Sequence, residues 1–136
     1  MKTSYTTILA AGFIVLIASL VILFAFIYLF PGLMEEYYNP VFRASAFKTD
    51  WLFYAHPFVL CFALSWFWEQ YKVLFNGPLI MKALQVSLAY AAVAALPVLW
   101  LTFSAIDISV IMVLTWLFYG IIQSFIAGII FAKFSP

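Results

Sequence analysis

Charged residues are so widely spaced along this chain that they leave four long apolar segments between them. Residues 3–34, 51–68, 83–106 and 108–132 contain no Asp, Glu, Lys or Arg. A helix rises about 1.5 Å per residue, so each segment is long enough to cross a hydrocarbon core of about 30 Å. The apolar residues follow one another without alternation, which excludes barrel strands. Helices are then the structure that satisfies backbone groups in lipid.

The pattern predicts an all-α fold: a single domain that is a transmembrane four-helix bundle, with helices running up-down-up-down. The predicted helices cover residues 5–30, 51–73, 79–103 and 107–133. The first helix is expected to be retained rather than removed as a signal peptide, because its apolar part is too long and no small-residue cleavage site follows it.

Helix ends and breaks are predicted from proline, glycine and capping residues. Pro97 should kink the third helix or mark its end. Asp50 is expected to cap the second helix, and Ser104 or Asp107 to open the fourth. In the long loop 31–50, Asn39 and a following proline favour a short interfacial helix over residues 40–48; the alternative is an irregular loop.

The distribution of Lys and Arg predicts the orientation. Four crossings place both termini and the middle loop on one side, which carries Lys2, Lys72, Lys82 and Lys133. The other side carries Arg43 and Lys48. Because basic residues favour the cytoplasmic side, both termini are expected in the cytoplasm, with the protein in the cell inner (plasma) membrane. On the cytoplasmic side Trp66, Trp68 and Tyr71 are expected at the membrane interface, and Glu69 can pair with Lys72.

Small residues recur at every fourth position in the last two helices. The third-helix stripe is Ala83, Ser87, Ala91 and Ala95, and the fourth-helix stripe is Gly120, Ser124, Gly128 and Ala132. Small residues let helices in lipid approach closely, so we expect the two stripes to face each other; the alternative is that one faces a second subunit.

Composition agrees with a membrane protein and excludes several functions. The chain is 68% hydrophobic and 8% charged, whereas soluble domains are about a quarter charged. A net charge of +1 provides no basic patch for nucleic acid. The single cysteine, Cys61, is interpreted as a packing residue. No catalytic or metal-binding motif stands out, and no cofactor is predicted.

Polar residues inside or near the apolar segments are the candidate site. His56 is the only histidine and lies in the second helix; it is either a hydrogen-bonded structural residue or a functional one. Arg43, Asp50 and Tyr54 lie near the outer boundary, where an enzyme acting on lipid headgroups or quinones would place such groups, although ordinary solvation of a loop also explains them.

Two glutamines occur at similar predicted depth in the last two helices. Gln85 lies near the start of the third helix and Gln123 late in the fourth. They are expected to form a hydrogen bond between these helices; the alternative is a polar translocation path.

Two segments of the chain are distinctive: FYAHPF at 53–58 running into ALSWFW at 63–68, and YGIIQSFIAG at 119–128. They resemble segments of small bacterial inner-membrane proteins with four helices and no assigned function. The resemblance implies the topology and carries no activity.

Three functional hypotheses follow. The first is a protein that acts by helix–helix contact, as an accessory or assembly subunit or a self-associating bundle, with the lipid bilayer, other membrane subunits or a second copy as partners. The second is an oligomeric small-solute transporter or channel, and the third an interfacial lipid or quinone enzyme.

Overall fold

The computed structural model describes residues 3–44 and 46–136, and it is all-helical, with 85% helix and no strand in the described part. Four long spans account for most of it. They are α1 (Tyr5–Leu29), α3 (Phe47–Tyr71), α6 (Val110–Phe134) and a third span made of α4 (Leu79–Tyr90), the π-helical η3 (Ala91–Ala95) and α5 (Leu96–Ala105). All four are long and apolar enough to cross a membrane, which indicates a multi-pass membrane protein.

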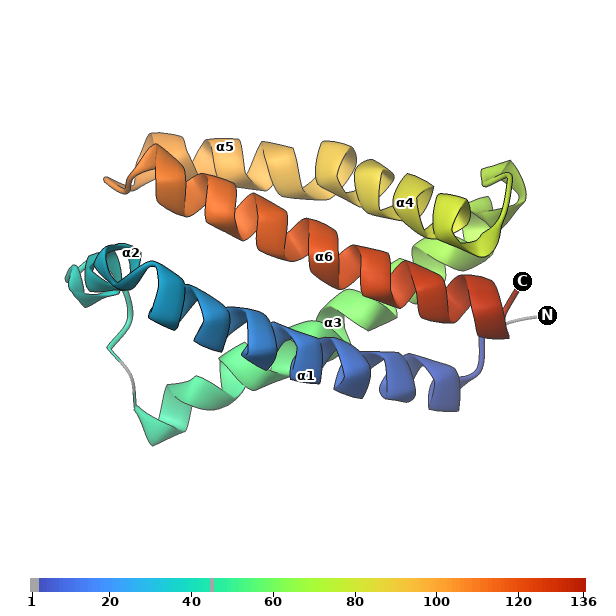
Figure 1. Ribbon diagram of the computed structural model, residues 1–136, viewed down its shortest axis with the longest axis horizontal. Helices are drawn as coiled ribbons and strands as arrows, with labels where there is room; N and C mark the ends of the chain where they lie inside the picture. Colours follow the sequence, from blue (N-terminus) through green and yellow to red (C-terminus); the bar gives the residue numbers. More distant parts are fainter. Residues whose placement is uncertain (1–2, 45) are drawn as a thin grey trace.

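Helix α6 is the central element of the bundle. It packs against α1, α3 and α4, and α1 also packs against α3. The two termini lie at the same end, here called the terminal end (Figure 1). The opposite, distal end holds α2 (Pro31–Glu35), the 3-10 helix η1 (Glu36–Tyr38) and Asp107. Residues of α3 and α4 share the core near the terminal end, where Trp68 and Val86 belong to one apolar cluster. Figure 1 shows α3 and the third span diverging toward the distal end, so this side of the bundle is open there.

The small-residue stripes lie in the interface between α4 and α6. An added Cβ on Gly128 would lie 3.1 Å from the Cα of Ala83. The Ser87 and Ser124 hydroxyls are 3.1 Å apart, and Ser87 donates to the Ile121 carbonyl at 2.7 Å. The absence of bulky side chains thus lets the two backbones approach closely. Ala91 is also buried, whereas Ala95 is only partly buried.

Pro97 does not end the third span. Proline lacks an N–H and its ring would clash with the carbonyl four residues earlier, that of Val93. The preceding segment is π-helical, and the Leu96 N–H reaches the Ala91 carbonyl, one residue further back than in an α-helix. Helix α5 then continues to Ala105.

Two predictions about helix starts are wrong. Helix α3 begins at Phe47 and the Asp50 carboxylate lies in its first turn, accepting the Ala46 N–H at 3.0 Å. Helix α6 begins after Ser109, whose hydroxyl accepts the Met112 N–H, rather than at Ser104 or Asp107.

Of the two alternatives for the first loop, the interfacial helix over 40–48 is not formed and the irregular loop is observed. Residues 40–44 form a turn, a bend and irregular chain, Ser45 lies outside the described residues, and α3 has begun by Phe47. Asn39 closes that turn by accepting the Val41 N–H at 3.0 Å. The helical part of the loop lies earlier, at α2 and η1, where Pro31 occupies the first turn of a helix.

A polar cluster joins both chain ends to the end of α3. Glu69 Oε1 accepts hydrogen bonds from Thr3 N–H at 2.8 Å and from the Ser135 hydroxyl at 3.0 Å. The predicted pair of Glu69 with Lys72 is confirmed at 3.5 Å. Trp68 is 1% exposed and donates to the Ser135 carbonyl at 2.8 Å, so its ring is buried within the protein at the terminal end.

Candidate functional site

A cavity of about 440 Å³ occupies the open side of the bundle between α3, the third span and α6. We call it the central cavity. Its walls are mostly apolar, and its lining residues are His56, Tyr90, Ala94, Ala95, Val98, Leu99, Thr102, Trp116, Tyr119, Gly120 and Gln123. It exists because α3 and α5 diverge, so that no side chain fills the space. In this wall the ring of Tyr90 packs on Gly120, 3.4 Å from the position that a Cβ would take.

Gln123 is the polar residue of this wall that is most completely buried, at 1% exposed. Its Nε2 donates to the Ser19 hydroxyl on α1 at 2.8 Å, and that hydroxyl donates to the Val15 carbonyl at 2.6 Å. Its Oε1 is buried and accepts no hydrogen bond from any described residue. Buried polar atoms in proteins are almost always paired, so the unpaired state of this amide oxygen is unusual.

His56 lines the same cavity from α3. It forms no hydrogen bond with any described residue, and it is followed by the buried Pro57. Gln123 lies 13 residues into the 25-residue α6, about 20 Å along the helix, so the cavity is at mid-depth of the bundle. Polar and ionisable groups at such depth in a membrane are functional candidates by default.

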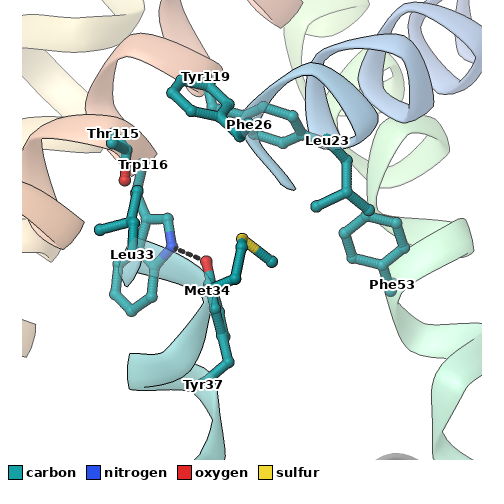
Figure 2. Close-up of a pocket in the computed structure, with 9 residues that line it drawn as sticks. All are labelled: Leu23, Phe26, Leu33, Met34, Tyr37, Phe53, Thr115, Trp116 and Tyr119. Atoms are coloured by element: carbon teal, nitrogen blue, oxygen red, sulfur yellow. Dashed lines mark hydrogen bonds between the residues drawn. The ribbon is translucent and has the colours of Figure 1, made fainter. Parts of the chain in front are cut away.

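A second pocket, of about 270 Å³, lies nearer the distal end (Figure 2). Phe26 of α1, Phe53 of α3 and Trp116 of α6 contribute to its walls, and Trp116 Nε1 donates to the Tyr37 hydroxyl at 2.6 Å. Burial raises the pKa of Tyr37, while the hydrogen bond from Trp116 acts in the opposite direction. Trp116 and Tyr119 line both this pocket and the central cavity, so these two rings stand between them.

The outer-boundary candidates are not assembled around His56. Arg43 and Asp50 line a surface hollow beside the first loop, and Asp50 and Tyr54 line another at the start of α3. His56 belongs to neither hollow. Among the described residues, His56 therefore does not share a site with Arg43, Asp50 or Tyr54. No group of three or more His, Cys, Asp or Glu in the described part could hold a metal ion.

The expected hydrogen bond between Gln85 and Gln123 is wrong. Gln85 instead exchanges two hydrogen bonds with the Asn76 backbone, accepting from N–H at 3.1 Å and donating to the carbonyl at 3.2 Å. The pairing of Ser87 with Ser124 places Gln123 level with Leu88, three residues beyond Gln85 along α4. This offset of about 4.5 Å separates the two amides.

Sequence reasoning did not select Ser19, Tyr90, Thr102 or Tyr119 as site residues. Ser19 is an isolated hydroxyl in an apolar run, and only the packing of α1 on α6 shows that it holds Gln123. Tyr90, Thr102 and Tyr119 show no distinguishing pattern in the sequence, and only the packing of the helices places them around the central cavity.

Comparison with models of protein families, with curated proteins and with solved structures finds no match for this chain. The fold and the site therefore define it only as a helical protein of membrane type with a lateral, mid-depth cavity, and the function has to be argued from that cavity.

Proposed function

We propose that this chain is a membrane protein that binds, without catalysis, a small and largely apolar molecule bearing one polar group. The observation that carries the proposal is the central cavity itself, of about 440 Å³ and with mostly apolar walls. Ligand sites are commonly cavities of about 300–1,000 Å³ with mostly apolar walls and a few placed polar groups. His56 supplies a polar group in this wall.

The size of the cavity favours a small molecule over a helix of a partner protein. A helix is about 10 Å wide, so a volume of 440 Å³ corresponds to roughly four residues of one, far less than a transmembrane span. A molecule with a ring and a short chain fits this volume. The cavity opens sideways between α3 and α5, so such a molecule would enter from the lipid.

Orientation is part of the proposal. We infer that both termini are cytoplasmic and that the membrane is the inner (plasma) membrane, since Lys72, Lys82 and Lys133 all belong to the terminal end. In a Cys61→Ala background, an impermeant maleimide added to intact cells should label Val41→Cys and spare Pro136→Cys. The opposite labelling pattern would overturn the orientation.

Photolabelling tests the binding proposal. The probe is an alkylphenol with a diazirine in its chain, added to the protein in lipid nanodiscs, and adducts are mapped by mass spectrometry. Labels should concentrate on residues of the central cavity. Ala94→Phe, which fills the cavity, should remove them. Val93→Phe is the matched control, because Val93 immediately precedes Ala94, is 74% exposed and does not line the cavity.

Labels scattered over exposed residues of α1 and α5, and unchanged in Ala94→Phe, would show that the probe only dissolves in lipid. That result would refute the binding proposal.

Action by helix contact is the second candidate. The small-residue stripes that motivated it pack against each other within the chain. What supports it now is α5, which has no buried residue and presents Val98, Trp100 and Leu101 at 62–78% exposure. With Cys61→Ala as background, Trp100→Cys should then cross-link to a second copy or another subunit in native membranes. A product that stays monomeric would remove this candidate.

A further inference from the structure

We infer that the central cavity holds its occupant by a hydrogen bond from the Tyr90 hydroxyl to a carbonyl oxygen of that molecule. The inference deepens the proposed function and rests on it. It concerns the polar group of the occupant, which the cavity volume alone does not determine.

The Tyr90 hydroxyl is a donor without a partner. It forms no hydrogen bond with any described residue, although the side chain is partly buried. Gln123 Oε1 is the one buried and unpaired side-chain polar atom in the described part of the chain, so the Tyr90 oxygen retains accessible surface. Tyr90 and Gly120 both line the cavity, and this oxygen lies 3.8 Å from the position that a Cβ on Gly120 would take. The hydroxyl is therefore at the cavity wall and open to contact.

The depth of Tyr90 leaves this donor few partners outside the protein. Tyr90 lies eleven residues after Leu79, the first residue of the third span, which is about 17 Å along the helix. The hydrocarbon core is about 30 Å thick, so the hydroxyl lies near its middle, away from water and lipid headgroups. A phenylalanine would pack on Gly120 without placing a polar group at this depth. Such groups inside a membrane are functional candidates.

The backbone beside Tyr90 keeps space open for an occupant. The π-helical segment Ala91–Ala95 begins at the next residue, and its Ala94 and Ala95 line the cavity. Short π-helical segments within helices are frequent at functional sites. The methyl side chains of these alanines leave room in front of the Tyr90 ring. A carbonyl oxygen accepts a hydrogen bond without bringing a hydrogen that needs an acceptor of its own, so a ketone satisfies Tyr90 and adds no unpaired donor.

The other donors of the cavity wall are mostly engaged. Thr102 donates to the Val98 carbonyl at 2.8 Å, and Trp116 Nε1 donates to the Tyr37 hydroxyl. His56 forms no hydrogen bond with any described residue, so the experiment has to distinguish its ring from the Tyr90 hydroxyl.

Matched probe pairs test the inference. 2-Undecanone and 2-methyl-1-undecene differ only in carrying oxygen or CH₂ on the same planar carbon, as do 4-pentylacetophenone and 4-pentyl-α-methylstyrene. Each competes with the photoreactive alkylphenol in nanodiscs, and its concentration in the bilayer is measured in parallel with empty nanodiscs. Each ketone should compete at about fivefold lower bilayer concentration than its alkene, the ratio expected for one hydrogen bond in a membrane protein.

Two variants assign the hydrogen bond to Tyr90. Tyr90→Phe keeps the ring and removes only the donor, so the fivefold ratio should fall to about one while competition by the alkene stays the same. Thr102→Val is the matched control, because Thr102 lines the same cavity but its hydrogen is already bonded to Val98. In this control the ratio should remain at about fivefold.

Infrared spectroscopy gives a measurement on the native chain that does not depend on how Tyr90→Phe folds. A hydrogen bond weakens the carbonyl double bond, so a ketone labelled with ¹³C at the carbonyl should show an additional band at lower frequency than in empty nanodiscs. Absence of this band would overturn the inference. In folded Tyr90→Phe the band should be lost.

The outcomes separate the inference from the proposed function. If ketone and alkene compete equally for labels within the cavity, binding stands and the hydrogen bond to a carbonyl is refuted. A ratio that persists in Tyr90→Phe also refutes it, and loss of that ratio in His56→Phe would then assign the bond to His56. If no probe competes and labels lie outside the cavity, the proposed function itself fails.

Discussion

Replacing Gly128 with alanine tests the contact that holds the third span to α6. The added Cβ would lie 3.1 Å from Cα and 3.2 Å from the carbonyl oxygen of Ala83. Carbon atoms in contact are normally about 3.5–4.0 Å apart. The obstacle is backbone, which cannot turn aside as a side chain would, so the two helices must separate by roughly 0.5 Å.

Gly120→Ala is the matched control for this substitution. Both glycines are buried in α6, so the gain in helix propensity, up to about 1 kcal/mol, is the same for both. At Gly120 the new Cβ would be 3.4 Å from the ring of Tyr90, a side chain that can move by rotation. The difference between the variants therefore isolates the clash with the Ala83 backbone.

Overpacking an interface costs about 1–3 kcal/mol. We expect Gly128→Ala to be less stable than Gly120→Ala by about 1–2 kcal/mol, toward the lower part of that range because the required shift is small. Reversible unfolding in mixed micelles, followed by tryptophan fluorescence, measures the difference. Equal stabilities of the two variants would refute the close packing of α4 on α6.

Three further predictions concern the polar groups. Glu69→Gln removes the charge that binds Lys72 and weakens the hydrogen bonds from Thr3, so we expect a loss of about 1–2 kcal/mol in the same unfolding measurement; no loss would show that the cluster at the chain ends is not stabilising. Because the pKa of Tyr37 is raised in the folded protein, the unfolded chain loses this proton first, so stability should be flat up to about pH 10 and fall above it. That fall should be smaller in Tyr37→Phe; an identical pH profile would contradict the assignment. Gln123→Met removes an unpaired buried oxygen at the expense of one hydrogen bond, so the empty protein should keep its stability or gain up to about 1 kcal/mol, and a loss above about 1 kcal/mol would contradict the unsatisfied state of Oε1.

The open side of the bundle connects the fold with the proposed function. A closed four-helix bundle would pack α3 against the third span and fill its interior with side chains. Here α6 bridges α1, α3 and the third span, and the space left beside it is lined by His56 of α3 and by residues of α5 and α6. The cavity is thus a consequence of how the four spans pack.

The amino-acid sequence by itself determined the four apolar helices, because the length and charge of a segment decide whether lipid can surround it. Its spacing of Ala83, Ser87, Ser124 and Gly128 was enough to suggest which helix faces meet, since a four-residue step keeps small residues on one face. The starts of helices were harder to predict from the sequence. The fourth helix was expected to begin at Ser104 or Asp107, whereas Ser109 caps it. Several neighbouring residues can act as the cap, and the path of the chain in the folded protein determines which of them does.

Only the tertiary structure decided the site. Gln123 donates a hydrogen bond to Ser19, 104 positions away, and Gln85 donates one to the Asn76 carbonyl. These partners depend on how the packed helices are rotated and on the depth of each residue in the bundle, which the local sequence pattern does not specify. The gap between α3 and α5 depends on a contact that is not made. No sequence periodicity records a missing contact, since each helix is equally apolar whether it faces a neighbour, lipid or a cavity.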